Sequence, residues 1–383
     1  MIIPTEYDEI RPYSPEELPG IFEELLADEQ FCGIVKYFYP EIPMDLLKRK
    51  LCGCKDNLEF QKAFIAPLLD KLLEKCSTGI EMDSLAITDK QTNYTYVSNH
   101  RDIVLDSAFL SILLLKNGFP STVEIAIGDN LLIYPWIKKL VRVNKSFVVQ
   151  RSLSMREMLM SSQRMSKYMH FAIAEKHESI WIAQREGRAK DANDRTQESV
   201  LKMMAMGGEG SVVERLASLN ICPVSISYEY DPCDYLKAKE FQQKRDIEGF
   251  KKSREDDLIN MKTGIFGYKG HIHYHVAPCI NHWLSELAYL PKGEIFAEIA
   301  RRMDKTIHLG YRLYPVNYVA YDLLTGKDEF ADHYSFEEKQ KAEAYINERV
   351  AMVDLPNKDE KFLRETILTM YANPVKNQLA AQL

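Results

Sequence analysis

The chain has 383 residues, 46% of them hydrophobic and 27% charged, an ordinary globular composition that allows one large core or two domains. Its net charge of −7 argues against a broad nucleic-acid-binding surface, and its seven scattered cysteines suit reduced thiols in a cytosol. The N-terminus reaches acid and proline too early for a signal peptide, and no apolar run approaches the about 18 to 20 residues that span a bilayer. We therefore expect a cytoplasmic protein whose contact with lipid is at most peripheral.

Residues 1–85 are predicted to form a helical N-terminal subdomain. The stretch Ser14-Pro15-Glu16-Glu17 has the order of a helix start, with a capping residue, a proline and then two acids. Apolar residues recur at helical spacing over 21–26 and again over 60–73. This pattern predicts helices that pack on one another.

In residues 86–280, short β-branched runs alternate with longer helical ones. The expected strands are 94–98, 123–127, 147–150, 179–183, 221–228 and 271–276, and the expected helices are 106–117, 130–141, 153–177, 196–219 and 234–260. Such alternation predicts an α/β domain with a mixed, mostly parallel sheet flanked by helices. Residues 281–383 are predicted to form a helical C-terminal extension, clearest at 281–288 and 335–353.

The stretch from Ser98 to Asp106 contains the strongest candidate for chemistry. His100 follows a strand-like run, and Asp106 stands at the start of an apolar helix, where an acid can orient an imidazole as a general base. An aspartate at such a position can equally be only a helix cap. No serine, cysteine or lysine nucleophile is marked nearby, so the base would activate a hydroxyl of the substrate. His100-Arg101-Asp102 also matches part of the protein-kinase catalytic loop, but Ser107 stands where that loop needs asparagine, and we discard this interpretation.

Two other predicted strands end in arginine-containing segments. Arg151 closes the first, and Arg185-Glu186-Gly187-Arg188 closes the second. Arginine suits recognition of phosphate, and glycine allows the backbone to approach a ligand closely. Each segment alone is also compatible with charges that pair at the protein surface.

The order of these segments resembles the four conserved blocks of the glycerolipid acyltransferase superfamily, and most of all glycerol-3-phosphate acyltransferases. Asn99-His100-Arg101 with Asp106 resembles the first block, and Arg151-Ser152 the end of the second. Glu186-Gly187-Arg188 resembles the third block, and Pro223 through Glu229 the fourth. The resemblance covers about residues 90 to 280.

Two departures from the family pattern leave alternatives open. The family has four residues between histidine and aspartate, and this chain has five, so the partner of His100 is either Asp106 or Asp102. We favour Asp106, because the apolar helix after it aligns with the helix after the family's aspartate. The third block is one residue short, so either Arg188 or Arg185 is the expected phosphate contact.

The resemblance implies an O-acyltransferase that moves a fatty acyl group from acyl-CoA or acyl-carrier protein to glycerol 3-phosphate or lysophosphatidate in phospholipid synthesis. It implies no cofactor, no metal and no acyl-enzyme, with the membrane surface as a peripheral partner at the inner face of the cell membrane. The alternatives are an acyltransferase for another hydroxyl- or amine-bearing lipid, and a non-catalytic homologue that binds lipid or acyl thioester. The implied catalytic residues are His100 and Asp106, and the implied substrate-binding residues are Asn99, Arg101, Arg151, Arg185, Glu186, Gly187, Arg188 and Pro223.

Two further stretches have competing interpretations. Residues 134–143 combine aromatic and apolar residues with three cations, which suits a membrane interface but is as typical of a core helix. His271, His273 and His275 share one face of a predicted strand. Because they spread along about 13 Å, we expect no metal site and interpret the strand as the one that closes the sheet.

Overall fold

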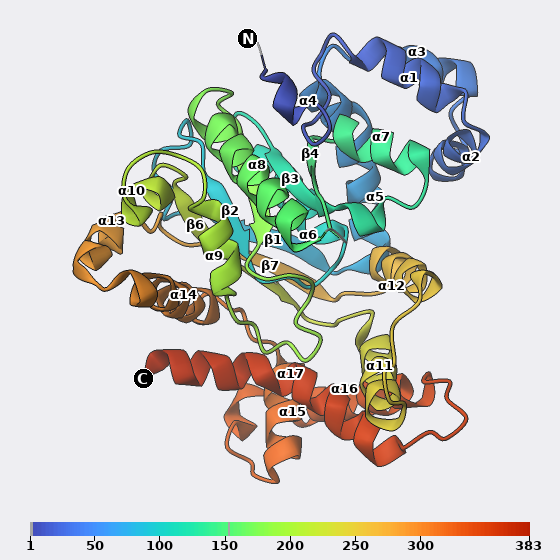
Figure 1. Cartoon of the computed structure of the whole chain (residues 1–383). Helices are drawn as coiled ribbons and strands as arrows, with labels where there is room; N and C mark the ends of the chain where they lie inside the picture. Colours follow the sequence, from blue (N-terminus) through green and yellow to red (C-terminus); the bar gives the residue numbers. More distant parts are fainter. Residues whose placement is uncertain (1–2, 152–153) are drawn as a thin grey trace.

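The computed structural model describes residues 3–151 and 154–383, so Met1, Ile2, Ser152 and Leu153 lie outside the described residues. Within them, seven strands form one sheet in the order β1-β7-β6-β2-β5-β3-β4 (Figure 1). All neighbouring strands run parallel except β6 and β7, which are antiparallel. The predicted mixed, mostly parallel sheet flanked by helices is therefore confirmed.

Six of the strands lie within one or two residues of the predicted ranges. The strands are β1 (Gly79–Asp83), β2 (Thr95–Ser98), β3 (Val123–Gly128), β4 (Ser146–Val149), β5 (Ser179–Ala183), β6 (Ile221–Tyr228) and β7 (His271–Val276). The sequence analysis missed β1, which is an edge strand without a buried residue. Because β1 lies beyond β7, the expectation that the histidine strand closes the sheet was wrong.

One face of the sheet is covered by α5 (Ala66–Cys76), α6 (Leu105–Lys116) and α12 (Arg254–Phe266) (Figure 1). Every residue of α6 from Leu105 to Leu114 is buried, which explains why its sequence is mostly apolar on all sides. The other face is covered by α8 (Met155–Ala174), α9 (Glu198–Met204), α10 (Val212–Ala217), α13 (Asn281–Leu284) and α14 (Lys292–Leu309). Strand side chains alternate between these two cores, as Trp181 and Ile182 of β5 show.

Two predicted helices are each divided in the structure. The range 196–219 becomes α9 and α10, separated by a segment in which Gly208 and Gly210 adopt positive φ. The range 234–260 becomes α11 (Asp234–Asp246) and α12, and Gly249 between them again has positive φ. Glycine adopts this backbone conformation without the steric penalty that other residues meet, so each glycine marks a change of chain direction.

The N-terminal helices form a core of their own with α7 (Pro135–Val143). They are α1 (Leu18–Leu26), α2 (Glu29–Phe38), α3 (Met44–Cys52) and α4 (Asn57–Phe60), and a π-helical turn leads from α4 into α5. Trp136 of α7 is buried against Phe31, and its indole donates a hydrogen bond to Gln30. This packing favours the core interpretation of residues 134–143 over the membrane interface.

The last three helices form another core, with Tyr230 and with Ala238 of α11. They are α15 (Pro315–Thr325), α16 (Phe336–Ala351) and α17 (Glu360–Gln382). The division of the chain at residues 85 and 280 remains a prediction. Helices α13 and α14, which follow residue 280, pack on the sheet rather than with this last core. Among the described helices, none has the length and apolar character needed to cross a membrane.

Candidate active site

His100 and Asp106 are in direct contact at the end of a central strand. Strand β2 stops at Ser98 and α6 begins at Leu105, so His100 lies on the short connection between them and Asp106 lies in the first turn of the helix. His100 Nδ1 lies 2.7 Å from Asp106 Oδ2. The Asp106 side chain is fully buried, whereas 13% of the His100 side chain is exposed. The carboxylate can therefore orient the imidazole from behind while the ring keeps access to a ligand.

The extra residue between His100 and Asp106 is accommodated by the backbone. Asp106 Oδ2 also accepts hydrogen bonds from the amides of Arg101, at 2.6 Å, and Asp102, at 3.1 Å. Asp102 instead accepts from the amides of Val104 and Leu105 and so caps the start of α6. Of the two candidate acids, Asp106 is the one that contacts His100.

The Asp102 side chain is buried. Burial and the neighbouring Asp106 charge raise the pKa of Asp102. Gly264 of α12 lies so close to the Asp102 carboxylate that a Cβ at this position would collide with it. Helix α12 therefore forms a wall beside the strand-to-helix connection, and Gly264 allows that close approach.

The other nitrogen of His100 is open. Within the described part of the chain, the hydrogen-bond partner of the ring is Asp106, on Nδ1. The edge of the ring faces Trp181 of β5, with centroids 5.6 Å apart and planes at 67°. When Nδ1 donates to Asp106, Nε2 carries the lone pair and can accept a proton from a substrate hydroxyl.

Asn99 and Arg101, both predicted to bind substrate, point into the protein. The Asn99 amide exchanges two hydrogen bonds with the backbone of Ile226 on β6. The Arg101 guanidinium lies 2.7 Å from Asp194, whose side chain is fully buried and also accepts a hydrogen bond from Tyr311. These contacts hold the first block against the fourth block and the loop after β5.

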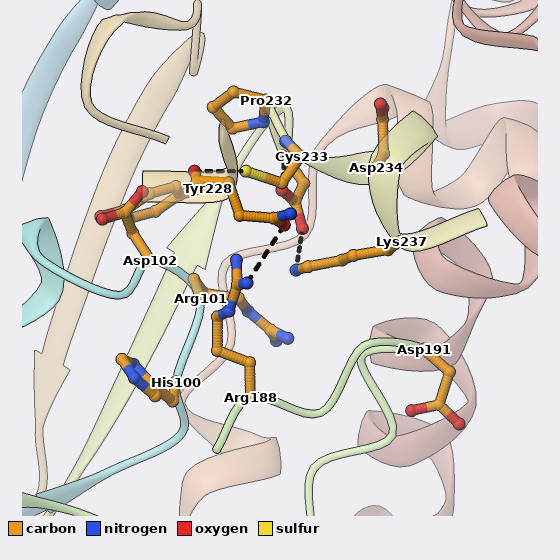
Figure 2. Close-up of polar contacts among 12 residues, drawn as sticks. His100, Arg101, Asp102, Arg188, Asp191, Tyr228, Pro232, Cys233, Asp234 and Lys237 are labelled. Carbon is orange, nitrogen blue, oxygen red and sulfur yellow. Dashed lines mark hydrogen bonds and ion pairs between the residues drawn. The ribbon is translucent and has the colours of Figure 1, made fainter. Parts of the chain in front are cut away.

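Arg188 lies on that loop and extends toward Cys233, which precedes α11, and toward Lys237 in the first turn of that helix (Figure 2). One of its terminal nitrogens donates to Asn260 of α12 at 3.3 Å, and the other is buried without a partner among the described residues. Asp231 lies nearby: burial raises its pKa, but the charges of Lys237 and Arg188 outweigh burial and lower it. Arg188 is thus a partly unsatisfied cation beside the site.

The remaining predicted binding residues are spread over a wider area. Arg185 has a buried Nε without a partner among the described residues. Arg151 pairs with Glu186 at 3.2 Å, and Gly187 between the two third-block charges adopts a left-handed φ of 65°. Pro223 is buried inside β6, in register with Val97 of β2, and so lies within the sheet rather than at its end.

Sequence reasoning missed several residues that the fold brings to this site. They are Tyr228, Asp194, Asp231, Lys237 and Asn260. Tyr228 was quoted as part of the fourth block, but its contact with Asp106, at 3.0 Å, depends on how β6 lies beside β2. A signal was present for Tyr228, which ends a predicted strand, and for Lys237, which lies in the segment after Glu229 that also resembles the fourth block.

The fold and site define a class of α/β enzyme in which a histidine oriented by a buried carboxylate lies at the C-terminal end of a mostly parallel sheet. Residues 80–227 match the family model described as Acyltransferase. For this part of the chain, the match confirms the predicted resemblance to the glycerolipid acyltransferase superfamily.

Among solved structures, the chain matches the 1-acyl-sn-glycerophosphate (LPA) acyltransferase, PlsC, from Thermotoga maritima. The alignment has 12% identity and a TM-score of 0.37, and it covers 75% of this chain and 93% of that chain. No curated protein matches the chain.

Proposed function

We propose that this acyltransferase moves a fatty acyl group from an acyl thioester to a hydroxyl of glycerol 3-phosphate or lysophosphatidate in phospholipid synthesis. The observation that supports the proposal most is the 2.7 Å contact between His100 Nδ1 and the buried Asp106. The pair lies in the acyltransferase domain and has the geometry of an oriented general base. A homologue that had lost catalysis through the inserted residue would be expected to lack this contact.

The proposed reaction needs one base and no covalent intermediate. His100 Nε2 accepts the proton of the acceptor hydroxyl, and Asp106 stabilises the imidazolium that forms. The hydroxyl oxygen attacks the thioester carbonyl, so a carbon–oxygen bond forms and the carbon–sulfur bond breaks. The thiolate leaves and receives the proton from His100, which returns the enzyme to its starting state.

The acceptor's phosphate is proposed to lie against Arg188. Its unpartnered buried nitrogen supports this choice, since an N–H group shielded from water is costly without an acceptor. Arg185 has a similar unpartnered nitrogen and is the second candidate. Arg151 already pairs with Glu186, and it would have to leave this pair to take part.

The proposed partners are acyl-CoA or acyl-carrier protein as donor and a glycerol phosphate or lysophospholipid as acceptor. Because the donor carries an oily chain, we propose that the protein works in the cytoplasm, peripherally at the inner face of the cell membrane. Another hydroxyl- or amine-bearing lipid remains the alternative acceptor.

A radiolabelled acyl-transfer assay tests the proposal. Purified protein is given palmitoyl-CoA or palmitoyl-acyl-carrier protein, each with glycerol 3-phosphate, lysophosphatidate or unphosphorylated glycerol. We expect product with one phosphorylated acceptor and little with glycerol. Equal transfer to glycerol would contradict the phosphate contact, and no product with any pair would contradict the proposed donors and acceptors.

A further inference from the structure

Tyr228 contacts the carboxylate of Asp106 on the side opposite His100 Nδ1. It is the last residue of β6, its side chain is buried, and its hydroxyl donates to Asp106 Oδ1 at 3.0 Å. The other carboxylate oxygen, Oδ2, is shared by His100 and the amides of Arg101 and Asp102. Among the described residues, Tyr228 is thus the partner of Oδ1.

Neighbouring contacts fix the place of this tyrosine. Asn99 holds Ile226 of β6 by two hydrogen bonds, which sets the position of Tyr228 relative to the His100 connection. On the adjacent strand β7, Tyr274 donates to the backbone carbonyl of Asp106 at 2.9 Å. Two buried phenols therefore reach Asp106, one at its carboxylate and one at its backbone.

We infer that Tyr228 is a positioning residue for acyl transfer: it holds the Asp106 carboxylate so that Oδ2 stays on His100 Nδ1 and Nε2 faces the acceptor hydroxyl. The inference rests on the proposed function. Without the phenol hydroxyl, Oδ1 is a buried charged oxygen with no donor, and the carboxylate gains freedom to rotate away from His100.

Tyr228 can donate throughout the useful pH range. Burial, with the nearby Tyr274 and Asp106 oxygens, raises its pKa well above the ordinary value, so the hydroxyl keeps its proton. The other charged or titratable groups around the pair come from its own loop, the loop after β5, the turn after β6, the segment before β7 and strand β7 itself. They are Arg101, Asp102, Asp194, Asp231, Lys269 and Tyr274.

The test is Tyr228→Phe, which removes one oxygen and keeps the ring. We expect kcat to fall about 10- to 100-fold, as for loss of a hydrogen bond to a charged group, with KM little changed. The acidic limb of the pH profile of kcat/KM should move to lower pH, because a carboxylate that rotates away from His100 stabilises the imidazolium less. Loss of packing alone would not produce such a movement.

Two tyrosines provide matched controls. Tyr96→Phe removes a fully buried hydroxyl that has no partner among the described residues, and should leave kcat and the pH profile as in the wild type. Tyr274→Phe removes an equally buried donor from the Asp106 backbone, and should leave the acidic limb in place. A Tyr228→Phe variant with wild-type kcat and an unmoved limb would overturn the inference while the proposed function stands.

A second readout is independent of activity. The proton that His100 Nδ1 shares with Asp106 can be followed by NMR in the enzyme without substrate. We expect its resonance to shift or broaden in Tyr228→Phe and to stay in place in Tyr96→Phe. If the wild type transfers no acyl group, the proposed function fails, whereas an unchanged resonance in Tyr228→Phe refutes the positioning role alone.

Discussion

At the scale of single residues, two aspartates four positions apart have different tasks. Asp106 contacts His100, whereas Asp102 caps helix α6. The resemblance favoured Asp106, because the apolar helix after it aligns with the helix after the family's aspartate. It could not show that the backbone amides of Arg101 and Asp102 would donate hydrogen bonds to the Asp106 carboxylate. These bonds let the connection accommodate the extra residue between His100 and Asp106.

The two tasks predict different mutant phenotypes. Asp106→Asn should lower kcat by about 10²- to 10⁴-fold, because the imidazole loses the charge that stabilises its protonated form. Asp102→Ala should lower the free energy of unfolding by about 1 kcal/mol through loss of the helix cap. Steady-state kinetics and urea unfolding of both variants check this division. It would be contradicted if Asp102→Ala lost as much kcat as Asp106→Asn in a folded protein.

A pH-dependent reaction is expected at Cys279. A hydrogen bond from Cys222 lowers the pKa of Cys279 to about 7, although burial opposes this shift. Thiolate forms above the pKa, so alkylation of Cys279 by iodoacetamide should reach half of its maximal rate near pH 7, followed by mass spectrometry of the labelled peptide. Cys222→Ala removes the donor and should move this midpoint to higher pH. An unmoved midpoint would show that Cys222 does not stabilise the thiolate.

At the scale of elements, the strands were easier to predict than the helix ends. The β-branched and aromatic residues of buried strands such as β5 and β6 indicate a strand in the sequence, and the predicted bounds of both agree with the structure. Strand β1 carries two acids in five residues and is half exposed, so its sequence lacks that signal. The breaks after α9 and α11 occur at glycines in left-handed conformations. The helical spacing of apolar residues continues on both sides of these glycines, so each sequence pattern predicted one long helix.

Helix α16 is tied to the start of α11 by a buried ion pair. Arg349 Nε lies 2.5 Å from Asp234, whose side chain is fully buried and also accepts hydrogen bonds from Tyr345 and Tyr371. Arg349→Ala should lower the free energy of unfolding by about 3 kcal/mol, because Asp234 would remain as an uncompensated buried charge.

A surface pair serves as the control for this prediction. Lys202→Ala breaks the exposed pair with Glu198, and should cost no more than about 0.5 kcal/mol. Urea unfolding of the two variants compares them directly. Equal destabilisation would show that the Arg349 pair contributes no more than a surface contact.

At the scale of the whole molecule, the site is assembled from segments far apart in the chain. The alternation of strands and helices predicted a mostly parallel sheet, and in the structure β2 and β5 pair in parallel, which places the first and third blocks at the same end of neighbouring strands. The sequence could not predict that Asp194 would form an ion pair with Arg101, or that Asn260 of α12 would accept a hydrogen bond from Arg188. Such contacts depend on how loops and helices cross between the blocks, and a single sequence contains no periodic signal for that.

The acyl-transfer rate of wild type and His100→Ala, with the phosphorylated acceptor that the wild type prefers, tests the central claim most directly. Both proteins are first compared by circular dichroism and thermal unfolding, so that a loss of rate is not a loss of fold. We predict that the wild type forms the acylated product and that folded His100→Ala forms it at least about 10³-fold more slowly, because no other group takes the hydroxyl proton. A folded His100→Ala variant that transfers acyl groups at a rate near that of the wild type would contradict the proposal that His100 is the general base.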